Sequence, residues 1–349
     1  MPLPQIDQAY LTRVLVELLN TPSPTGFTDA AISFVGRELK TLGTTATRTR
    51  KGALTATLAG AAHDAPRALT AHVDTLGAMV KAIKSNGRLK LSKLGSFAWN
   101  TVEGEHCQIF TRDQRMITGS LLVTKASAHI SRTEVAETLR QDDTMEVRLD
   151  ARTTSPDETR ALGIEVGDFV AFDPRVVVTE SGFIRSRHLD DKAGVAAMLA
   201  AVKALQDAGL APAQRTTLHF SNYEEVGHGA ASGFPPDLAE LVAVDMAAVG
   251  AGQTSDEFHV TICVKDSGGP YHHGLSNRLR DLADQHEIPY KVDIYPYYGS
   301  DGEAFWRAGG DVRVALIGPG VDASHNYERT HMDALIGTTQ LILAYLLGE

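Results

Sequence analysis

The sequence has few of the features that mark secreted, membrane-spanning or nucleic-acid-binding proteins. It holds only two cysteines, Cys107 and Cys263, far apart and outside any CxxC pattern, so we interpret both as reduced structural thiols. No apolar run approaches membrane-spanning length, and no basic tract accompanies the net charge of −10. The N-terminus also lacks a basic segment followed by an apolar one. We therefore expect a cytoplasmic protein whose partner is a small molecule or peptide, not nucleic acid or a membrane.

The length and the texture of the sequence indicate two domains. At 349 residues the chain exceeds the usual size of a single hydrophobic core. Residues 1–77 and 175–349 alternate between helical and strand periodicity, whereas residues 78–174 contain short strand-like runs separated by Gly, Asn and Asp. The sequence therefore predicts an α/β domain in two segments, 1–77 and 175–349, interrupted by a β-rich insert at 78–174 that is barrel-like or sandwich-like.

Apolar periodicity and turn residues locate the individual elements. Helices are expected at 10–19, 29–42, 131–140, 193–205, 275–286, 303–308 and 332–347. Strands are expected at 53–58, 67–73, 80–83, 106–110, 117–123, 145–149, 167–172, 215–221, 241–245, 258–264, 290–295 and 312–317.

Two consecutive carboxylates precede the apolar helix that begins near Ala193. Asp191 fits the N-cap of that helix, where a carboxylate accepts from free backbone N–H groups. Asp190 follows the apolar Leu189, and a second buried carboxylate is costly unless a positive group meets it. We hypothesise that Asp190 bridges two metal ions.

Other side chains that can bind metal follow predicted strands. The carboxyl ends of parallel strands lie along one edge of a sheet, so these side chains are expected to converge. Two carboxylates about 4 Å apart repel by roughly 4 kcal/mol at an effective dielectric of 20, and divalent cations remove that repulsion. The candidates are His72 with Asp74, Glu224 with Glu225, Asp245, and His325 beyond Gly318-Pro-Gly320.

Each candidate also has an ordinary structural interpretation. His72 and Asp74 share one face of a strand, so Asp74 either orients the imidazole of a ligating His72 or forms a turn beside a core histidine. Glu224 and Glu225 either divide between substrate and metal or form a solvated loop pair. Asp245 is either a ligand or a cap. Without a metal site, every one of these ordinary interpretations would have to be true at the same edge of the sheet. We therefore favour the metal site.

The C-terminal third leaves further alternatives open. His325 and His331 compete for the last ligand position, and we favour His325, because His331 could cap or pack beside the final helix. Ser300 and Asp301 line a substrate pocket or form a turn before a helix. We place Ser300, Asp301 and His331 next to the substrate.

The chain resembles the M42 metallo-aminopeptidases, the glutamyl or deblocking aminopeptidase group among the co-catalytic zinc peptidases. The matching segments run over nearly the full length in the family's order. They are Pro22-Ser-Pro-Thr-Gly26, His72-Val-Asp74 with Gly77, Leu189-Asp-Asp-Lys-Ala-Gly194, Glu224-Glu-Val-Gly227, Asp245, Gly299-Ser-Asp301 and the segment of His325.

The resemblance implies a catalytic mixed-sheet α/β domain with helices on both faces, and a β-barrel-like insert for dimerisation or substrate access. It implies two metal-ligand sets that share Asp190, with Glu224 as general base, Asp74 in the catalytic group, and a cis peptide bond between Asp190 and Asp191. The first set is His72, Asp190 and Asp245, and the second is Asp190, Glu225 and His325.

The implied activity is dinuclear metal-dependent hydrolysis of an N-terminal peptide bond through a metal-activated water. Two divalent ions are expected per chain, zinc foremost, with cobalt or manganese as alternatives. The resemblance also implies a homo-oligomer, built from dimers and extending to a dodecamer.

One departure from the family suggests an alternative function. Where members have His-Ser-Pro, this chain has His325-Asn-Tyr-Glu-Arg-Thr-His331, similar to a branch associated with N-acetylglutaminylglutamine amide osmolyte systems. The alternative is a metal-dependent amidase or dipeptidase acting on such a modified dipeptide. A metal-independent glycosidase and a non-catalytic binding protein are the remaining rivals.

Overall fold

The computed structural model describes residues 2–348, which form two compact units. Unit 1 contains the chain up to Asp74 and again from Arg175, and unit 2 runs from Thr75 to Pro174. The sequence-based boundaries fell after residues 77 and 174. Unit 1 is a mixed α/β fold and unit 2 contains a closed β-barrel, so the predicted fold class is confirmed.

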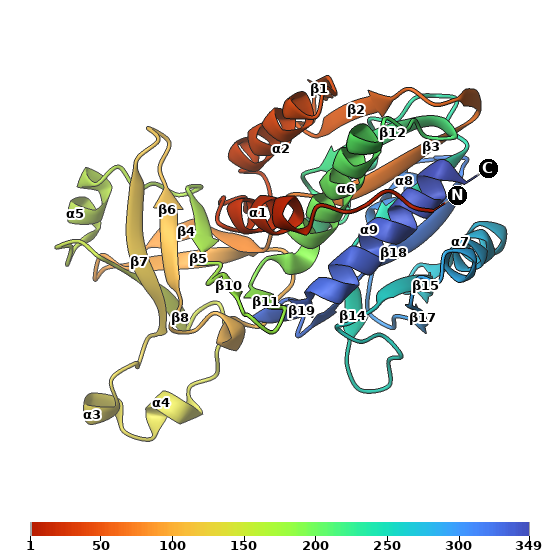
Figure 1. The fold of residues 1–349 in the computed structure, drawn as a ribbon. Helices are drawn as coiled ribbons and strands as arrows, with labels where there is room; N and C mark the ends of the chain where they lie inside the picture. The colour runs from red at the N-terminus through yellow and green to blue at the C-terminus, as the bar shows by residue number, and fades with distance from the viewer. Residues whose placement is uncertain (1, 349) are drawn as a thin grey trace. The chain divides into compact units, whose positions relative to one another are not determined.

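Unit 1 is built on one mixed sheet of thirteen strands within the described residues (Figure 1). The order along its main path is β1-β2-β12-β3-β13-β18-β19-β11-β10, and β15 joins β18 to β16 and β17. Strands β12, β3, β13 and β18 are mutually parallel, so their carboxyl ends share one edge. The strands are β1 (Ala46–Arg48), β2 (Leu54–Leu58), β3 (Ala62–His72), β10 (Val177–Val178), β11 (Phe183–Ser186), β12 (Gln214–Ser221), β13 (Glu240–Val244), β14 (Ala247–Val249), β15 (Val260–Asp266), β16 (Gly269–Pro270), β17 (Tyr290–Ile294), β18 (Arg313–Asp322) and β19 (Glu328–His331).

Successive residues of a strand point to opposite sides of the sheet. In the central strands the residues on both sides are apolar, so both faces of the sheet are apolar. On β13, Val242 and Val244 belong to the larger core with α1, α6, α7 and α9, whereas Leu241 and Ala243 belong to a smaller core beside α8. Near-continuous apolar runs are typical of strands buried on both faces. The helices are α1 (Gln8–Leu19), α2 (Asp29–Thr41), α6 (Leu189–Ala208), α7 (His273–Gln285), α8 (Asp301–Arg307) and α9 (Met332–Leu347).

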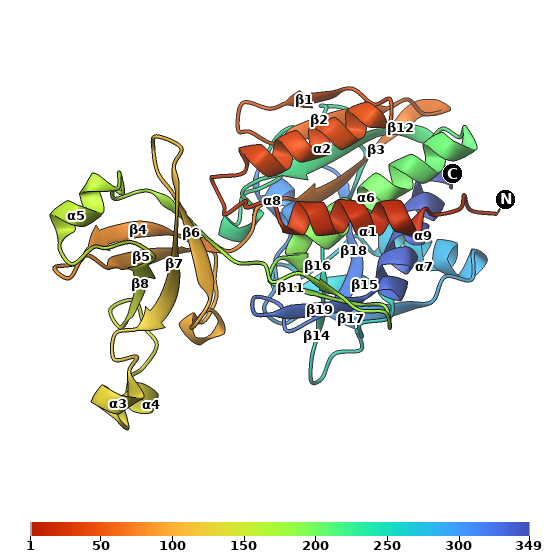
Figure 2. The ribbon, with the colours of Figure 1, turned by 60° about the vertical axis from the view of Figure 1, so that its left-hand side comes forward.

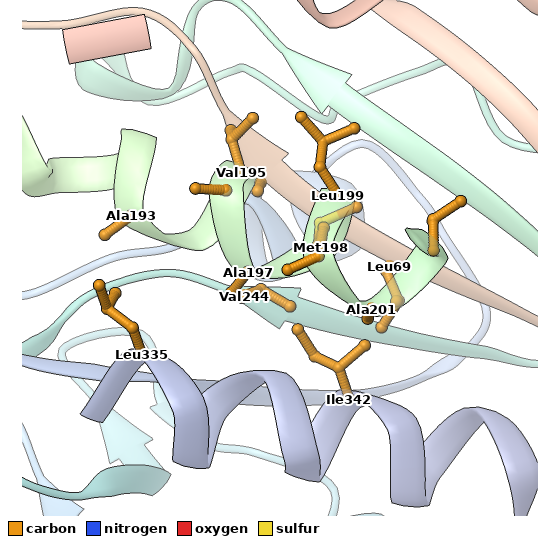
Figure 3. Close-up of a cluster of buried hydrophobic side chains, with 14 of the residues drawn as sticks. Leu69, Ala193, Val195, Ala197, Met198, Leu199, Ala201, Val244, Leu335 and Ile342 are labelled. Atoms are coloured by element: carbon orange, nitrogen blue, oxygen red, sulfur yellow. The ribbon is translucent and has the colours of Figure 1, made fainter. Parts of the chain in front are cut away.

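Helix α6 is the centre of the larger core. It is apolar around most of its circumference, as expected for a helix packed on several sides. Figure 3 shows Leu335 and Ile342 of α9 pointing toward α6, with Val244 and Leu69 of the sheet beside it. The backbone of Asp190 and Asp191 is not helical and the bond between them is cis, so the regular helix starts after Asp191.

Unit 2 closes six strands into a barrel in the order β4-β5-β8-β7-β6-β9 (Figure 2). Its own apolar core includes Val80, Ile109, Val147 and Trp99. The elements are β4 (Gly77–Ile83), β5 (Leu89–Leu94), η1 (Trp99–Thr101), β6 (His106–Phe110), β7 (Met116–Val123), α3 (Ala128–Ser131), α4 (Glu134–Glu137), β8 (Met145–Leu149), α5 (Pro156–Ala161) and β9 (Phe169–Phe172).

One helix prediction in unit 2 is wrong. The expected helix at 131–140 is replaced by two single turns, α3 and α4, on a loop that leaves the barrel (Figures 1 and 2). Arg132 between them has a φ of +48°, which a continuous right-handed helix cannot contain. Neither turn buries a residue, so no apolar face stabilises a longer helix.

Most other elements match their sequence-based ranges. The predicted helices 10–19, 29–42, 275–286 and 332–347 are present, with ends shifted by at most two residues. The short strands β1, β5, β10, β11, β14, β16 and β19 and the short helix α5 had no expected range. Among the helices within residues 2–348, none has the length and apolar character that crossing a membrane requires.

Candidate metal centre

The predicted ligands converge at the carboxyl edge of the parallel strands in unit 1. His72 is the last residue of β3, and Asp245 follows β13 directly. Glu224 and Glu225 form the 3-10 turn η2 (Glu224–Val226) after β12. Asp190 follows β11, and His325 follows β18. Five separate strands thus deliver polar side chains to one place, as the sequence predicted.

These side chains form two groups that share Asp190. In the first group, one donor atom from each of His72, Asp190 and Asp245 lies within 4.8 Å of the others, and all three residues are buried. His72 Nε2 is 3.0 Å from Asp190 Oδ1 and 3.9 Å from Asp245 Oδ1. We call this group the first triad.

The second triad consists of Asp190, Glu225 and His325, again within 4.8 Å of one another. His325 Nε2 is 3.4 Å from Asp190 Oδ2 and 3.6 Å from Glu225 Oε2. Asp190 therefore turns one carboxylate oxygen toward each histidine. Asp190 thus lies between the two histidines, and its role as a bridge between two ions stays a prediction.

His72 is oriented by a backbone contact. Its Nδ1 is 2.9 Å from the main-chain oxygen of Asp74, which can only accept, so Nδ1 carries the proton. Nε2 then presents its lone pair to the first triad, the arrangement that metal-binding histidines use. The Asp74 carboxylate was expected to hold this tautomer, but the main-chain oxygen makes the shorter contact.

Asp74 instead holds the turn that carries both glutamates. Its fully buried carboxylate accepts hydrogen bonds from the hydroxyl of Thr25 at 2.7 Å and from the backbone N–H groups of Glu224 and Glu225 at 3.1 and 3.3 Å. The structure therefore places Asp74 behind the two triads, where it supports η2.

Asp191 acts as the cap of α6, as its position predicted. Its Oδ1 accepts from the backbone N–H of Gly194 at 3.2 Å, and its Oδ2 accepts from the N–H of His72, also at 3.2 Å. Burial, together with the charge of Asp245, raises the pKa of Asp191 well above its ordinary value. This carboxylate therefore ties the start of α6 to the end of β3.

The remaining carboxylates crowd one another. Burial and the negative charge of Asp190 raise the pKa of Asp245 to about 7 and that of Glu225 to about 8. Burial also raises the pKa of Glu224 well above its ordinary value. Burial by itself would raise the pKa of Asp190 too. The hydrogen bonds of its carboxylate with His325 and His72 outweigh burial, so the pKa of Asp190 lies below its ordinary value. A buried cluster of this kind is costly unless cations neutralise it.

The donor set fits divalent metal ions. Each triad offers one imidazole and two carboxylates, the combination of nitrogen and oxygen ligands that zinc accepts and that cobalt and manganese tolerate. Glu224 belongs to neither triad, yet its Oε2 lies 3.8 Å from His72 Nε2, beside the first one.

The structure separates His325 from His331. His331 is the N-cap of α9, where its Nδ1 accepts from the backbone N–H of Asp333 at 3.1 Å. Its Nε2 donates to the main-chain oxygen of Ser181 at 2.9 Å. His331 therefore holds the start of the last helix, the capping alternative that its sequence position allowed.

Ser300 and Asp301 make protein contacts at the start of α8 and are both nearly fully buried. The Asp301 carboxylate accepts from the hydroxyl of Ser221 and from the backbone N–H of Ala230 at 2.7 Å. The Ser300 hydroxyl lies 2.7 Å from that of Tyr271. The contacts of Asp301 join β12 to the start of α8, and Ser300 is the N-cap of that helix, which fits the alternative of a turn before a helix. The place of Ser300 and Asp301 in a substrate pocket stays a prediction.

Two residues near the triads were not expected. Glu328 is fully buried, and its carboxylate accepts hydrogen bonds from the backbone N–H groups of Asp190 and His325. Tyr298 donates its hydroxyl to the main-chain oxygen of Met246 at 2.8 Å, and burial beside Asp245 raises its pKa. The one sequence signal for Glu328 is a glutamate three residues after a predicted ligand.

The chain is similar in sequence to known aminopeptidases. The sequence model of the family described as M42 glutamyl aminopeptidase matches residues 52–341. A Bacillus subtilis (strain 168) protein described as "Putative aminopeptidase YhfE" is 48% identical over 333 residues, which cover 95% of this chain and 96% of that protein.

Two solved structures share the fold. An aminopeptidase from the archaeon Desulfurococcus kamchatkensis superposes with a TM-score of 0.86 at 20% identity, covering 98% of this chain and 96% of that one. The TET1 peptidase of Pyrococcus horikoshii, described as able to assemble into a tetrahedron or a large octahedral shell, gives a TM-score of 0.85 at 22% identity, covering 97% and 100%.

Proposed function

This chain belongs to the M42 glutamyl aminopeptidase family, and we propose that it cleaves N-terminal peptide bonds with two divalent metal ions, one in each triad, and Glu224 as general base. Family membership and the close bacterial relative make the protein a metal-dependent aminopeptidase, a hydrolase of peptide bonds. The number of ions, the bridging role of Asp190 and the role of Glu224 are the proposal.

The sharing of Asp190 carries the proposal. A single ion site would need only one triad, whereas here one buried carboxylate directs a separate oxygen to each of two histidines. A carboxylate between two cations is stabilised from both sides, which offsets the cost of its burial. The surplus of buried carboxylates supports two cations over one.

Glu224 is the group best placed to move a proton. Divalent cations bound here would lower the pKa of water from 15.7 to about 7 and stabilise negative charge on the carbonyl oxygen. Glu224 lies at the rim of the first triad without belonging to it, and it is half-buried. It would accept the proton of the attacking water and deliver it to the leaving nitrogen.

The comparisons lend no support to the alternative function, an amidase or dipeptidase acting on a modified dipeptide osmolyte. Both the family description and the name of the Bacillus subtilis relative refer to aminopeptidases. An aminopeptidase acts on substrates with a free α-amine, and cations in the two triads could also bind that amine.

We also propose a homo-oligomer, with unit 2 contributing to the contacts between copies. The Pyrococcus horikoshii peptidase, which shares the fold, is described as able to assemble into a tetrahedron or a large octahedral shell. Light scattering coupled to gel filtration measures the mass directly. A species at the 37.5 kDa of one chain would exclude the assembly.

The activity is tested with a panel of aminoacyl anilides and N-acetylated dipeptide amides. Metal-free protein is reloaded with Zn²⁺, Co²⁺ or Mn²⁺, and each reaction is repeated with a chelator. We expect cleavage of the free-amine substrates by metal-loaded protein, and loss of that activity with the chelator. Cleavage of the acetylated amides alone would favour the osmolyte alternative, and chelator-insensitive turnover would exclude the metal mechanism.

A further inference from the structure

Glu328 joins the two backbone segments that carry the shared ligand and the last ligand. Its side chain is fully buried, and each of its oxygens accepts one backbone hydrogen bond. Oε2 accepts from the N–H of Asp190 and Oε1 from the N–H of His325, both at 3.1 Å. One carboxylate therefore spans residues that are 135 positions apart in the sequence, Asp190 and His325.

The strand pairing explains how Glu328 reaches both segments. It opens β19, which pairs antiparallel with β11, and Ser186 of β11 lies opposite Glu328. Asp190 comes four residues after Ser186, and His325 comes three residues before Glu328. The pairing therefore brings two segments next to the Glu328 side chain, residues 187–190, which lead into α6, and the loop after β18.

The loop that carries His325 needs such support. His325 has a φ of +62° and Ala323 a φ of +57°, left-handed values that are uncommon for residues other than glycine. A turn hydrogen bond joins the N–H of Asn326 to the oxygen of Ala323 at 3.1 Å. The bond from His325 to Glu328 adds a second closure, and an unusual conformation persists only when its surroundings hold it.

We propose that Glu328 is a positioning residue that fixes His325 and Asp190 for metal binding in the second triad. The inference rests on the proposed two-metal function. Groups that orient metal ligands commonly change metal affinity by 10–100-fold when they are altered. Glu328 holds the backbone of two of the three residues in the second triad, but of only one in the first. Its loss should therefore weaken the second triad more.

Two substitutions distinguish the positioning role of Glu328 from the effect of its negative charge on metal binding. Glu328→Gln keeps the size of the side chain but replaces one accepting oxygen with an NH₂ group, and it also removes a negative charge near the cations. Glu328→Asp keeps the charge and draws the carboxylate back by one methylene. If charge alone mattered, only the glutamine variant would bind metal more weakly.

Glu240→Gln is the matched control. Glu240 is another buried glutamate of unit 1, at the opposite end of β13 from Asp245, where it pairs with Arg278 and Arg313. Its substitution removes the same charge and also disturbs buried contacts, but it leaves both triads intact. It therefore measures how far general destabilisation affects metal binding.

The experiment is equilibrium dialysis of metal-free protein against Zn²⁺, with far-UV circular dichroism to verify folding. Wild type and Glu240→Gln should bind two equivalents with the same affinities. In both Glu328 variants one equivalent should lose affinity by about 10–100-fold, and the other should lose less.

The other outcomes are also decisive. Two equivalents bound by Glu328→Asp with wild-type affinity would overturn the positioning role while leaving the proposed function intact. A wild-type protein that binds fewer than two ions would overturn both. If both Glu328 variants failed to fold while Glu240→Gln folded, Glu328 would be a determinant of the fold, and the inference would be rejected.

Discussion

Glu224 is adjacent to the first triad but outside it, and for this reason we propose that it moves a proton whereas the triad residues bind metal. Its Oε2 is 3.8 Å from His72 Nε2, and its backbone is held by Asp74. Glu224→Gln should reduce kcat by at least about 100-fold, because general acid–base catalysis typically contributes that much. Bound zinc, measured by atomic absorption, should stay at the wild-type level. Activity near wild type would show that another group takes the proton.

Asp190 and Asp245 are both buried carboxylates, but they differ in the number of triads that they serve. Asp190→Ala removes a donor from both triads, whereas Asp245→Ala removes a donor only from the first. We expect dialysed Asp190→Ala to retain no metal and Asp245→Ala to retain about one ion. Equal metal content in the two variants would refute the bridging role of Asp190.

His219 supplies a pH dependence away from the ligands. Burial, with a smaller effect from the charge of Lys51, lowers the pKa of His219 to about 4. The unfolded chain binds this proton near pH 6.5, so stability is lost as the pH falls from about 6.5 to 4, by up to about 3 kcal/mol.

Replacing this histidine isolates its contribution to that pH dependence. His219→Asn keeps a polar atom that can bond the hydroxyl of Thr70, the partner of His219 Nδ1 at 3.1 Å. The free energy of unfolding, from urea titrations at several pH values, should vary less steeply in the variant, by up to about 1.4 kcal/mol per pH unit in this range. If the free energy of unfolding depended on pH equally in wild type and His219→Asn, the conclusion that the His219 imidazole is buried in its neutral form would be wrong.

At the scale of the helix, two glycines should respond in opposite directions. A Cβ on Gly36 in α2 would lie 3.7 Å from Leu54, an ordinary contact. A Cβ on Gly194 in α6 would lie 2.4 Å from the Asp191 carboxylate and 2.7 Å from the main-chain oxygen of Val244. Gly36→Ala should stabilise the protein by about 0.5–1 kcal/mol, whereas Gly194→Ala should destabilise it by about 1–3 kcal/mol.

Urea denaturation of the two variants measures both changes under the same conditions. Gly194→Ala should also weaken metal binding, because Asp191 must move and it bonds the N–H of His72. Stabilisation by both substitutions would mean that the start of α6 has more room than these contacts allow.

At the scale of the whole molecule, each unit contains one of the two tryptophans. Trp99 packs in the core of the barrel, and Trp306 lies on α8 in unit 1. Both triads lie in unit 1, so bound zinc should stabilise that unit, by about 2.7 kcal/mol at a free concentration of 100 times Kd.

Single-tryptophan variants test this asymmetry by fluorescence-monitored urea unfolding. Trp99→Phe leaves Trp306 as the reporter of unit 1, and Trp306→Phe leaves Trp99 as the reporter of unit 2. Zinc should shift the transition of the first variant to higher urea and leave that of the second unchanged. Equal shifts would show that the two units unfold as one.

The sequence by itself determined the fold class, most of the elements and the sheet edge where the polar residues meet. These features depend on local signals, since an apolar run or alternation defines a strand whatever lies far away in the chain. His72, Glu225 and Asp245 were found because each lies at or just beyond the end of a predicted strand, and parallel strands end together. Asp190 was found because it is a second carboxylate before the cap of an apolar helix.

Only the tertiary structure decided which polar side chains face the triads. His325 reaches the second triad and His331 caps α9, a difference set by the loop after β18 and by the pairing of β19 with β11. The contacts of Asp74 and the position of Glu328 likewise join segments far apart in sequence. Such contacts depend on the conformation of loops and on the pairing of distant segments, and local periodicity carries no information about either.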